Sequence, residues 1–296
     1  MADKKGDIKE LLVKGFFTLN GIAVVLVLVG IFTLLVITAV PAFKEISMKE
    51  FLFSPDWNPT GYDGEKYGIV SLLVSTALVT VGALVIAVPI GIGAAAYLSD
   101  IAGERVREIA KPIVEILAGI PSVVLGFLGI VLIGPVIAKL FGLPNGLNAL
   151  NGSVLLAIMA LPTIISISED ALNSVPMSFQ QASLALGATK WQTIALVKIP
   201  AALSGILASC MLGMGRAIGE TMTVLMATGC AAAMPHGLLD SVRTMTATIA
   251  IELGEVAYGS THYYALFAVG LVLFLITFIV NMLSDMVLRK YQNVER

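Results

Sequence analysis

Six stretches of the 296-residue chain are each long and apolar enough to cross a lipid bilayer, whose core of about 30 Å takes roughly 20 residues of α-helix. In lipid, every backbone N–H and C=O group must find its partner within the protein, so such segments form helices. The stretches cover residues 16–40, 71–98, 113–138, 152–168, 201–233 and 263–288. The sequence therefore predicts an all-α, polytopic membrane protein with six transmembrane helices.

The composition excludes a soluble globular domain and a nucleic-acid-binding protein. Hydrophobic residues make up 57% of the chain and charged residues 13%, whereas soluble domains carry about 25% charged residues. The net charge of −2 provides no basic surface for DNA or RNA. The stretch 16–40 is longer than the apolar core of about 7 to 15 residues in a signal peptide, so we interpret it as a retained anchor helix.

Basic residues in the loops predict which side of the membrane each loop faces. When the loops alternate between the two sides, twelve of the 18 Lys and Arg residues fall on one side and five on the other, with Arg216 inside a stretch. The first side holds Lys4, Lys5, Lys9, Lys14, Arg105, Arg107, Lys111, Lys190, Lys198, Arg289, Lys290 and Arg296, and the second holds Lys44, Lys49, Lys66, Lys139 and Arg243. Because loops rich in Lys and Arg stay in the cytoplasm, both termini are predicted to be cytoplasmic.

These boundaries also define the predicted parts of the chain. They are a cytoplasmic N-terminal segment 1–15, a first helix 16–40, an outer loop 41–70, a transmembrane domain 71–288 and a cytoplasmic end 289–296. The outer loop 41–70 contains Trp57, and the outer loop 234–262 contains both histidines. These two loops either form a docking surface or only connect helices.

Cysteine and histidine do not predict a disulfide or a metal site in this sequence. Cys210 and Cys230 both fall in the stretch 201–233, and on one helix they would lie about 30 Å apart, beyond the reach of a disulfide. Together with His236 and His262, they lack the usual spacing of zinc ligands. We expect no intrachain disulfide and no bound metal.

A structured loop is predicted at 178–206, because this segment is too polar to span a membrane and too apolar to be disordered. Gly187 permits a turn between two helices. The apolar residues form two stripes, Phe179, Ala182 and Leu186 before the turn and Trp191, Ile194 and Val197 after it. A helix–turn–helix that points into the cytoplasm and an amphipathic hairpin that lies among the lipid headgroups both fit this pattern.

Two charged residues, Arg216 and Glu220, lie within the fifth stretch, four positions apart and therefore on one face of a continuous helix. An arginine at mid-membrane costs about 2.5 to 3.5 kcal/mol, so it should face protein or water. Gly215 and Gly219 form a small-xxx-small pair that lets another helix approach. Glu220 would neutralise Arg216 in an empty site. Alternatively, the two residues form an ion pair that only fixes helix packing.

The same pair has a chemical preference among oxyanions. A guanidinium presents parallel donors that fit two oxygens of a tetrahedral anion. A carboxylate beside it accepts a hydrogen bond from a protonated oxygen, which phosphate has near neutral pH and sulfate lacks. If both residues face the ligand, the pair therefore favours phosphate over sulfate.

The segment 178–200 resembles the coupling loop shared by permease subunits of ABC importers, with the pattern Glu-Ala-Ala, three residues, Gly, nine residues, Ile-x-Leu-Pro. The positions that fall on this pattern are Gln181, Ala182, Ser183, Gly187, Val197, Ile199 and Pro200, with Trp191 between them. Gln181 and Ser183 depart from the pattern's Glu and second Ala. The resemblance implies the ABC type I importer (MetI-like) permease fold and a separate ATPase subunit whose groove receives the loop.

The chain itself contains no G-x-x-x-x-G-K-[ST] phosphate-binding motif. We therefore expect it to bind no cofactor, with ATP and Mg on the partner ATPase. It is expected to be a transport subunit and not an enzyme.

Residues 216–221, RAIGET, resemble the signature of phosphate-importer permeases. The Met-Thr-Val that follows is similar to permeases of the PstC type, whereas the PstA type continues with Ala-Pro. Further similarity to the PstC type extends over PIGIGAAAYLSD at 89–100, EILAGIPSVVLGFLG at 115–129 and ALGATKW at 185–191. The resemblance implies a phosphate-importer permease in the bacterial inner membrane.

This family assignment implies a set of partners and site residues. The partners are a homologous permease of the PstA type, two PstB-type ATPase subunits, a periplasmic PstS-type phosphate-binding protein, inorganic phosphate and membrane lipid, with no nucleic acid. The candidate residues for substrate translocation are Arg216, Glu220 and Thr221, followed by the hydroxyl groups of Ser122 and Thr76. The candidates for ATPase coupling are Gln181, Ala182, Ser183, Gly187, Trp191 and Pro200.

Three alternatives fit parts of the sequence. The chain could be a permease for molybdate or sulfate, the companion PstA-type subunit, or a membrane-embedded enzyme that uses Arg216, Glu220 and the outer histidines as an acid–base site. The enzyme is disfavoured because the sequence has no H-E-x-x-H and no G-x-S-x-G motif. The histidines also lie in a loop away from the two intramembrane charges.

Overall fold

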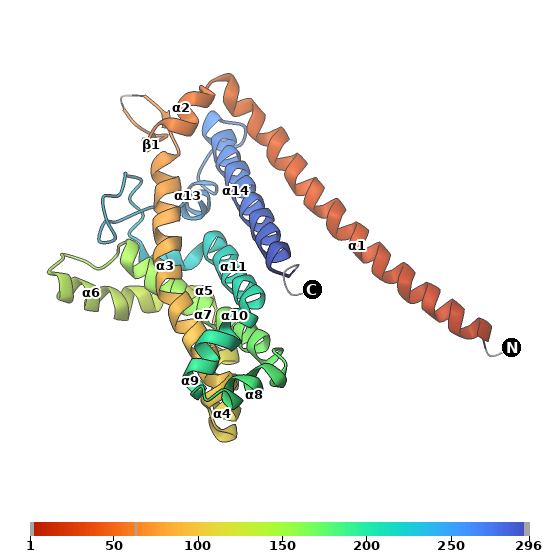
Figure 1. The fold of residues 1–296 in the computed structure, drawn as a ribbon. Coiled ribbons are helices and arrows are strands. Elements are labelled where there is room, and N and C mark those ends of the chain that lie inside the picture. The colour runs from red at the N-terminus through yellow and green to blue at the C-terminus, as the bar shows by residue number, and fades with distance from the viewer. Residues whose placement is uncertain (1–2, 63, 293–296) are drawn as a thin grey trace.

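The computed structural model describes residues 3–62 and 64–292, and these residues are mostly helical (Figure 1). The exception is an antiparallel pair of short strands, β1 (Trp57–Asn58) and β2 (Lys66–Tyr67). Shorter helical elements are α2 (Met48–Phe53), α8 (Met177–Ala185), α9 (Lys190–Thr193), η4 (Ile194–Lys198), α10 (Ile199–Ala201), α12 (Met222–Ala227) and α13 (Met245–Glu252). The predicted all-α class is confirmed.

Five helical segments of the described chain are long and apolar enough to cross a membrane, and the number is six if one bent pair of helices counts as a single span. The five are α1 (Asp3–Ala39) with η1 (Val40–Lys44), α3 (Val70–Ala96) with the π-helix η2 (Tyr97–Ile101), α5 (Ser122–Leu128) with the π-helix η3 (Gly129–Ile133) and α6 (Gly134–Phe141), α7 (Ala149–Asn173), and α14 (Thr261–Gln292). The bent pair joins residues 190–201 to α11 (Leu203–Gly219) at 73°. Counted in this way, the predicted six spans are present.

The third span begins later than predicted. Residues 113–118 of the predicted stretch belong to α4 (Glu104–Ala118), a separate amphipathic helix, and the apolar span starts at Ser122. Pro121 is extended, with φ −60° and ψ 138°, so the helical backbone of α4 ends before it. The break therefore separates two helices within the predicted stretch 113–138.

The fifth span is shorter than the predicted stretch 201–233. Its helix α11 ends at Gly219, Glu220 is extended with φ −69° and ψ 133°, and the chain continues as α12. The expectation of one continuous helix is wrong because hydropathy does not register a break between two apolar segments. Consequently Cys210 lies in α11 and Cys230 lies beyond α12, and both are free thiols.

Small residues let α7 and α11 pack closely. A Cβ atom at Gly205 would lie 2.3 Å from the Cβ of Ala171, so this contact requires glycine. One turn further along α11, Ser209 and Ser168 share a hydrogen bond of 2.7 Å. Close approach through small residues and hydrogen bonds between helices are the usual basis of helix association in lipid, where no hydrophobic effect drives packing.

The outer loops 41–70 and 234–262 are tied together at one end of the molecule. Trp57 donates its Nε1–H to the Glu252 carboxylate, with N–O distances of 3.1 and 3.0 Å. Arg243 and His262 each reach the same carboxylate at 2.8 Å. The two loops therefore form one outer structure, which Figure 1 shows around α2 and β1.

The opposite end of the molecule carries α4, α8, α9 and α10 (Figure 1). The same figure shows that α1 leans away from the bundle and lies close to α14 only over part of its length. At that contact the rings of Phe32 and Phe274 lie 5.6 Å apart. The remaining apolar surface of α1 is exposed in the isolated chain, as expected for a helix that lipid covers.

Candidate functional site

The break between α11 and α12 is held by the side chain of Glu220. Its Oε1 accepts a hydrogen bond of 3.1 Å from the backbone N–H of Thr223, which satisfies one of the free donors at the start of α12. The backbone carbonyl of Glu220 accepts a hydrogen bond of 2.8 Å from the hydroxyl of Thr246, near the start of α13. The first contact holds the Glu220 carboxylate and the second holds its backbone at the end of the broken span.

Arg216 lies in the last turn of α11, and its side chain is exposed. It forms no hydrogen bond or ion pair with any residue that the structure describes. The prediction that Arg216 and Glu220 share one helical face is wrong, because α11 ends between them. A guanidinium in an apolar span must face water or protein and not lipid.

The glycines around Arg216 leave its surface open. A Cβ atom at Gly219 would have no other atom within 4 Å, whereas one at Gly215 would lie 3.8 Å from the Oδ1 of Asn281 on α14. The predicted small-xxx-small pair therefore packs on a helix of this chain at Gly215 and not at Gly219. The face that carries Arg216 and Gly219 is available to a second subunit or to a solute.

Two of the other predicted hydroxyl residues, Thr221 and Ser122, also lie at the break between α11 and α12. Thr221 directly follows Glu220, and its hydroxyl lies 3.4 Å from the carbonyl of Gly219. Ser122 comes close because its carbonyl accepts a hydrogen bond of 3.1 Å from the Thr223 hydroxyl, so the start of α5 lies against α12. The structure therefore brings Ser122, Glu220 and Thr221 together at one break.

Thr76 is engaged elsewhere. Its hydroxyl donates to the carbonyl of Leu72 at 2.8 Å and accepts from the backbone N–H of Met245 at 3.1 Å. It therefore fixes the start of α13 on α3. Sequence reasoning missed Thr223 and Thr246, and these two threonines connect α5 and α13 to the break without any local motif that would have revealed them.

Residues 177–193 form two short helices joined by a tight turn, and we call them the α8–α9 segment. Gly187 lies at the turn with φ +87°, a left-handed conformation that side chains with a Cβ atom rarely adopt. The Thr189 hydroxyl and the Gln192 side chain cap α9 reciprocally. Ser183 and Thr193 share a hydrogen bond of 2.9 Å that holds α8 against α9. The predicted helix–turn–helix is therefore present.

The apolar side chains of the α8–α9 segment point away from the protein. Leu186 is 90% exposed and Trp191 is 68% exposed. Gln181, Ala182 and Pro200 are also exposed, whereas Ser183 is partly buried by its contact with α9. Large exposed apolar side chains on a preformed motif mark an interaction surface.

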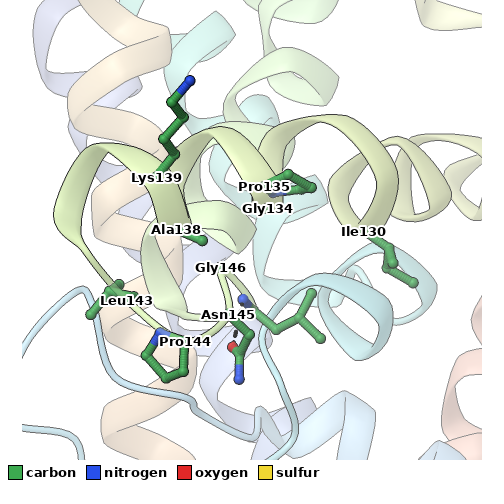
Figure 2. Close-up of a pocket in the computed structure, with 10 residues that line it drawn as sticks. Ile130, Gly134, Pro135, Ala138, Lys139, Leu143, Pro144, Asn145 and Gly146 are labelled. Carbon is green, nitrogen blue, oxygen red and sulfur yellow. Dashed lines mark hydrogen bonds between the residues drawn. The ribbon is translucent and has the colours of Figure 1, made fainter.

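A groove of about 580 Å³ lies between α6 and the loop that follows it. Its lining residues are Ile130, Gly134, Pro135, Ala138, Lys139, Leu143, Pro144, Asn145, Gly146 and Leu147. Figure 2 shows the Lys139 side chain extended away from the other lining residues. The groove contains none of the predicted site residues, and Lys139 is its one charged lining residue.

Comparison with known proteins agrees with this arrangement. Residues 87–293 match the family described as binding-protein-dependent transport system inner membrane component. The chain is 40% identical over 234 residues to the probable ABC transporter permease protein YqgH of Bacillus subtilis. The alignment covers 79% of this chain and 75% of that protein. The chain is 35% identical over 249 residues to the phosphate transport system permease protein PstC of Mesorhizobium japonicum. This alignment covers 78% of this chain and 75% of that protein.

The structural comparison concerns the fold alone. The chain is similar to the MetNI methionine ABC transporter in an inward-facing conformation, with a TM-score of 0.59, 21% identity, and coverage of 75% of this chain and 95% of that chain. The MetI-like permease fold predicted from the sequence is therefore confirmed. The chain belongs to the family of binding-protein-dependent transport system inner membrane components and is a multi-pass permease subunit of an ABC transporter.

Proposed function

We propose that this chain is the PstC-type permease subunit of an ATP-driven importer of inorganic phosphate and forms half of the translocation pathway. The observation that carries the proposal is the exposed Arg216 in the last turn of a broken apolar span, followed at the break by the Glu220 carboxylate that caps α12. The similarity to a relative named phosphate transport system permease protein supports phosphate as the transported anion.

The chemistry of this site favours a protonated tetrahedral anion. Arg216 donates two hydrogen bonds to phosphate oxygens, and the Glu220 carboxylate, held by Thr223, accepts one from the protonated phosphate oxygen. Thr221 and Ser122 add hydroxyl groups at the same break, with Thr76 as a weaker candidate. Sulfate has no proton near neutral pH, so it cannot donate a hydrogen bond to the carboxylate, and the two negative charges would repel each other.

A homologous subunit of the PstA type completes the pathway in this proposal. The span Ser122–Phe141 extends sideways from the bundle in Figure 1 and exposes large apolar side chains, including Val123, Phe127 and Val131. The Arg216 face of α11 is open as well. Two such subunits would enclose the arginine between them and exclude lipid from it.

Permeases of this family work with a separate ATPase and a substrate-binding protein, and they do not hydrolyse ATP themselves. For this chain we propose two PstB-type ATPase subunits that bind the α8–α9 segment, and a PstS-type protein that binds the outer structure around Trp57 and Glu252. ATP and Mg bind to the ATPase, and this chain binds neither.

The proposed orientation places both termini and the α8–α9 segment in the cytoplasm of a bacterium. A cysteine at Ser178, in a chain whose Cys210 and Cys230 are replaced by serine, is expected to resist a membrane-impermeant thiol reagent in intact cells. A cysteine at the fully exposed Tyr62 of the outer loop serves as the control and is expected to react readily. Reaction at position 178 together with protection at position 62 would invert the topology.

Reconstitution tests the proposed function. Proteoliposomes that contain this chain, its homologous subunit, the ATPase and the binding protein are expected to accumulate radiolabelled phosphate only when ATP and the ATPase are present. An embedded enzyme would turn over its substrate without the ATPase, and a scaffold would support no uptake. Either result would contradict the proposal.

A further inference from the structure

Glu169 and Lys198 are the two charged residues classed as buried in the described part of the chain, and both lie away from the Arg216 site. Glu169 is 2% exposed near the end of α7, and Lys198 is 8% exposed at the end of η4. Removing a charge from water is unfavourable unless it is paired and hydrogen-bonded. Each of these residues has such a partner.

Lys198 is held by the end of the second span. Its Nζ lies 2.6 Å from the Oδ1 of Asp100 and donates to the Ser99 hydroxyl at 3.0 Å. Asp100 and Lys198 are 98 positions apart, yet each lies in a π-helical segment, η2 and η4 respectively. Such segments are rare and occur frequently at functional sites.

The hydrogen bonds continue from Ser99 to two further helices. The Ser99 hydroxyl donates to the Oδ1 of Asn173 at 2.8 Å, and the Asn173 amide donates to the Oε1 of Glu169 at 3.5 Å. Lys111 on α4 then pairs with the same Glu169 oxygen at 3.1 Å. We call Ser99, Asp100, Lys111, Glu169, Asn173 and Lys198 the Lys198 network.

The network lies at the base of the α8–α9 segment. Asn173 is the last residue of α7, before this segment, and Lys198 follows it, so the two ends of the segment are joined through Ser99 on the second span. Directly after Lys198 and α10, the chain bends by 73° into α11, which carries Arg216.

An apolar cluster packs beside the network. Its buried residues are Ala95, Ala96, Leu172, Ile194, Ala202 and Ile206, from the ends of α3 and α7, from η4 and from the start of α11. Ionic hydrogen bonds are stronger in such low-dielectric surroundings than in water. The cluster and the network therefore connect the α8–α9 segment to α3, α4, α7 and α11.

We propose that the Lys198 network transmits movement of the α8–α9 segment to the spans that line the pathway, with Lys198 as its central positioning residue. This proposal rests on the proposed function, because it needs an ATPase that moves the segment. Lys198 contacts neither phosphate nor nucleotide in this account. Its loss should uncouple ATP hydrolysis from transport while the complex still assembles.

The experiment compares Lys198→Met, Lys198→Arg and Asp100→Asn in the reconstituted complex. The measured quantities are phosphate taken up per ATP hydrolysed and the stimulation of hydrolysis by the phosphate-loaded binding protein. We expect Lys198→Met and Asp100→Asn to lower both quantities at least about tenfold, and Lys198→Arg, which keeps the charge, to retain most of both. Asp100→Asn has nearly the volume of the original side chain and decides the question if Lys198→Met does not assemble.

The matched control is an exposed lysine of the same chain. Lys14 is exposed on α1, outside the Lys198 network, the α8–α9 segment and the outer structure. Lys14→Met is therefore expected to leave both quantities unchanged. A parallel fall of uptake and hydrolysis at a constant ratio in Lys198→Met, or equal defects in Lys198→Met and Lys198→Arg, would overturn the proposal.

A second readout does not depend on which anion is carried. A cysteine at Gly219, on the open face beside Arg216, is expected to change its reactivity with a thiol reagent when ATP binds to the complex. In Lys198→Met this change should be lost. If wild-type complexes take up no phosphate, the proposed function fails. An unchanged ATP response at position 219 in Lys198→Met sinks the network proposal alone.

Discussion

Arg216→Met is expected to lower phosphate uptake per assembled complex by about ten- to hundredfold, because hydrogen bonds to a charged group contribute about 1.5 to 3 kcal/mol and methionine supplies none. The oxyanion would then cross a low-dielectric path without a partner. The helix itself should persist, since Arg216 forms no hydrogen bond or ion pair within the described chain. The measurement is the initial rate of uptake, normalised to the amount of complete complex.

Three further variants separate a substrate contact from a packing role. Arg216→Lys should be intermediate, because it keeps the charge and loses the two-pronged donor geometry. Glu220→Gln keeps an acceptor for the Thr223 N–H and removes the charge, so it should reduce phosphate uptake without opening the break. Arg105→Met, at an exposed arginine of α4, is the control and should transport normally.

A double substitution tests the packing alternative directly. If Arg216 and Glu220 serve only in packing, Arg216→Met with Glu220→Gln, which keeps the acceptor for the Thr223 N–H, should be nearly neutral. The site account predicts that this double variant assembles and does not transport. Near-normal uptake by it would reject Arg216 as a substrate residue.

Gly187→Val is expected to weaken binding of the ATPase and to reduce uptake about tenfold or more, because a strained backbone conformation costs about 1 to 3 kcal/mol per residue and valine is β-branched. The cause would be the φ of +87°, since a Cβ atom at this position meets no other atom within 4 Å. The turn would therefore relax and misplace Leu186 and Trp191. Co-purification of the ATPase and phosphate-dependent ATP hydrolysis are the measurements.

The matched variant at this position is Gly187→Asn. Asparagine tolerates the left-handed region far better than valine, so it should retain most of the coupling. Normal ATPase binding and normal hydrolysis in Gly187→Val would show that the turn does not seat the α8–α9 segment in its partner.

The sequence predicted the parts of this fold that depend on hydropathy and on residues close together in the chain. Apolar length located the spans, and Gly187 between two apolar stripes predicted the helix–turn–helix. The break after Gly219 was not predicted, because it depends on the Glu220 carboxylate capping α12 and on Thr246 reaching its carbonyl. Residues four positions apart share a face only within one continuous helix, and this break separates Arg216 from Glu220.

The polar contacts between helices were likewise beyond sequence reasoning. Lys198 counted only as a cytoplasmic loop charge, although it is buried against Asp100 of the second span. The two residues have no local signal that links them, and the π-helical turns that contain them come from packing. Residue types at the Arg216 site were predicted from the sequence, whereas their arrangement around a broken helix required the structure.

The identity of the transported anion is tested most directly by anion competition in proteoliposomes that contain the complete complex. Radiolabelled phosphate uptake is measured with ATP inside and with excess unlabelled phosphate, sulfate or molybdate added together with the binding protein. We expect ATP-dependent uptake that unlabelled phosphate abolishes and that sulfate and molybdate leave nearly unchanged. Equal competition by sulfate or molybdate, or transport of either in place of phosphate, would contradict it.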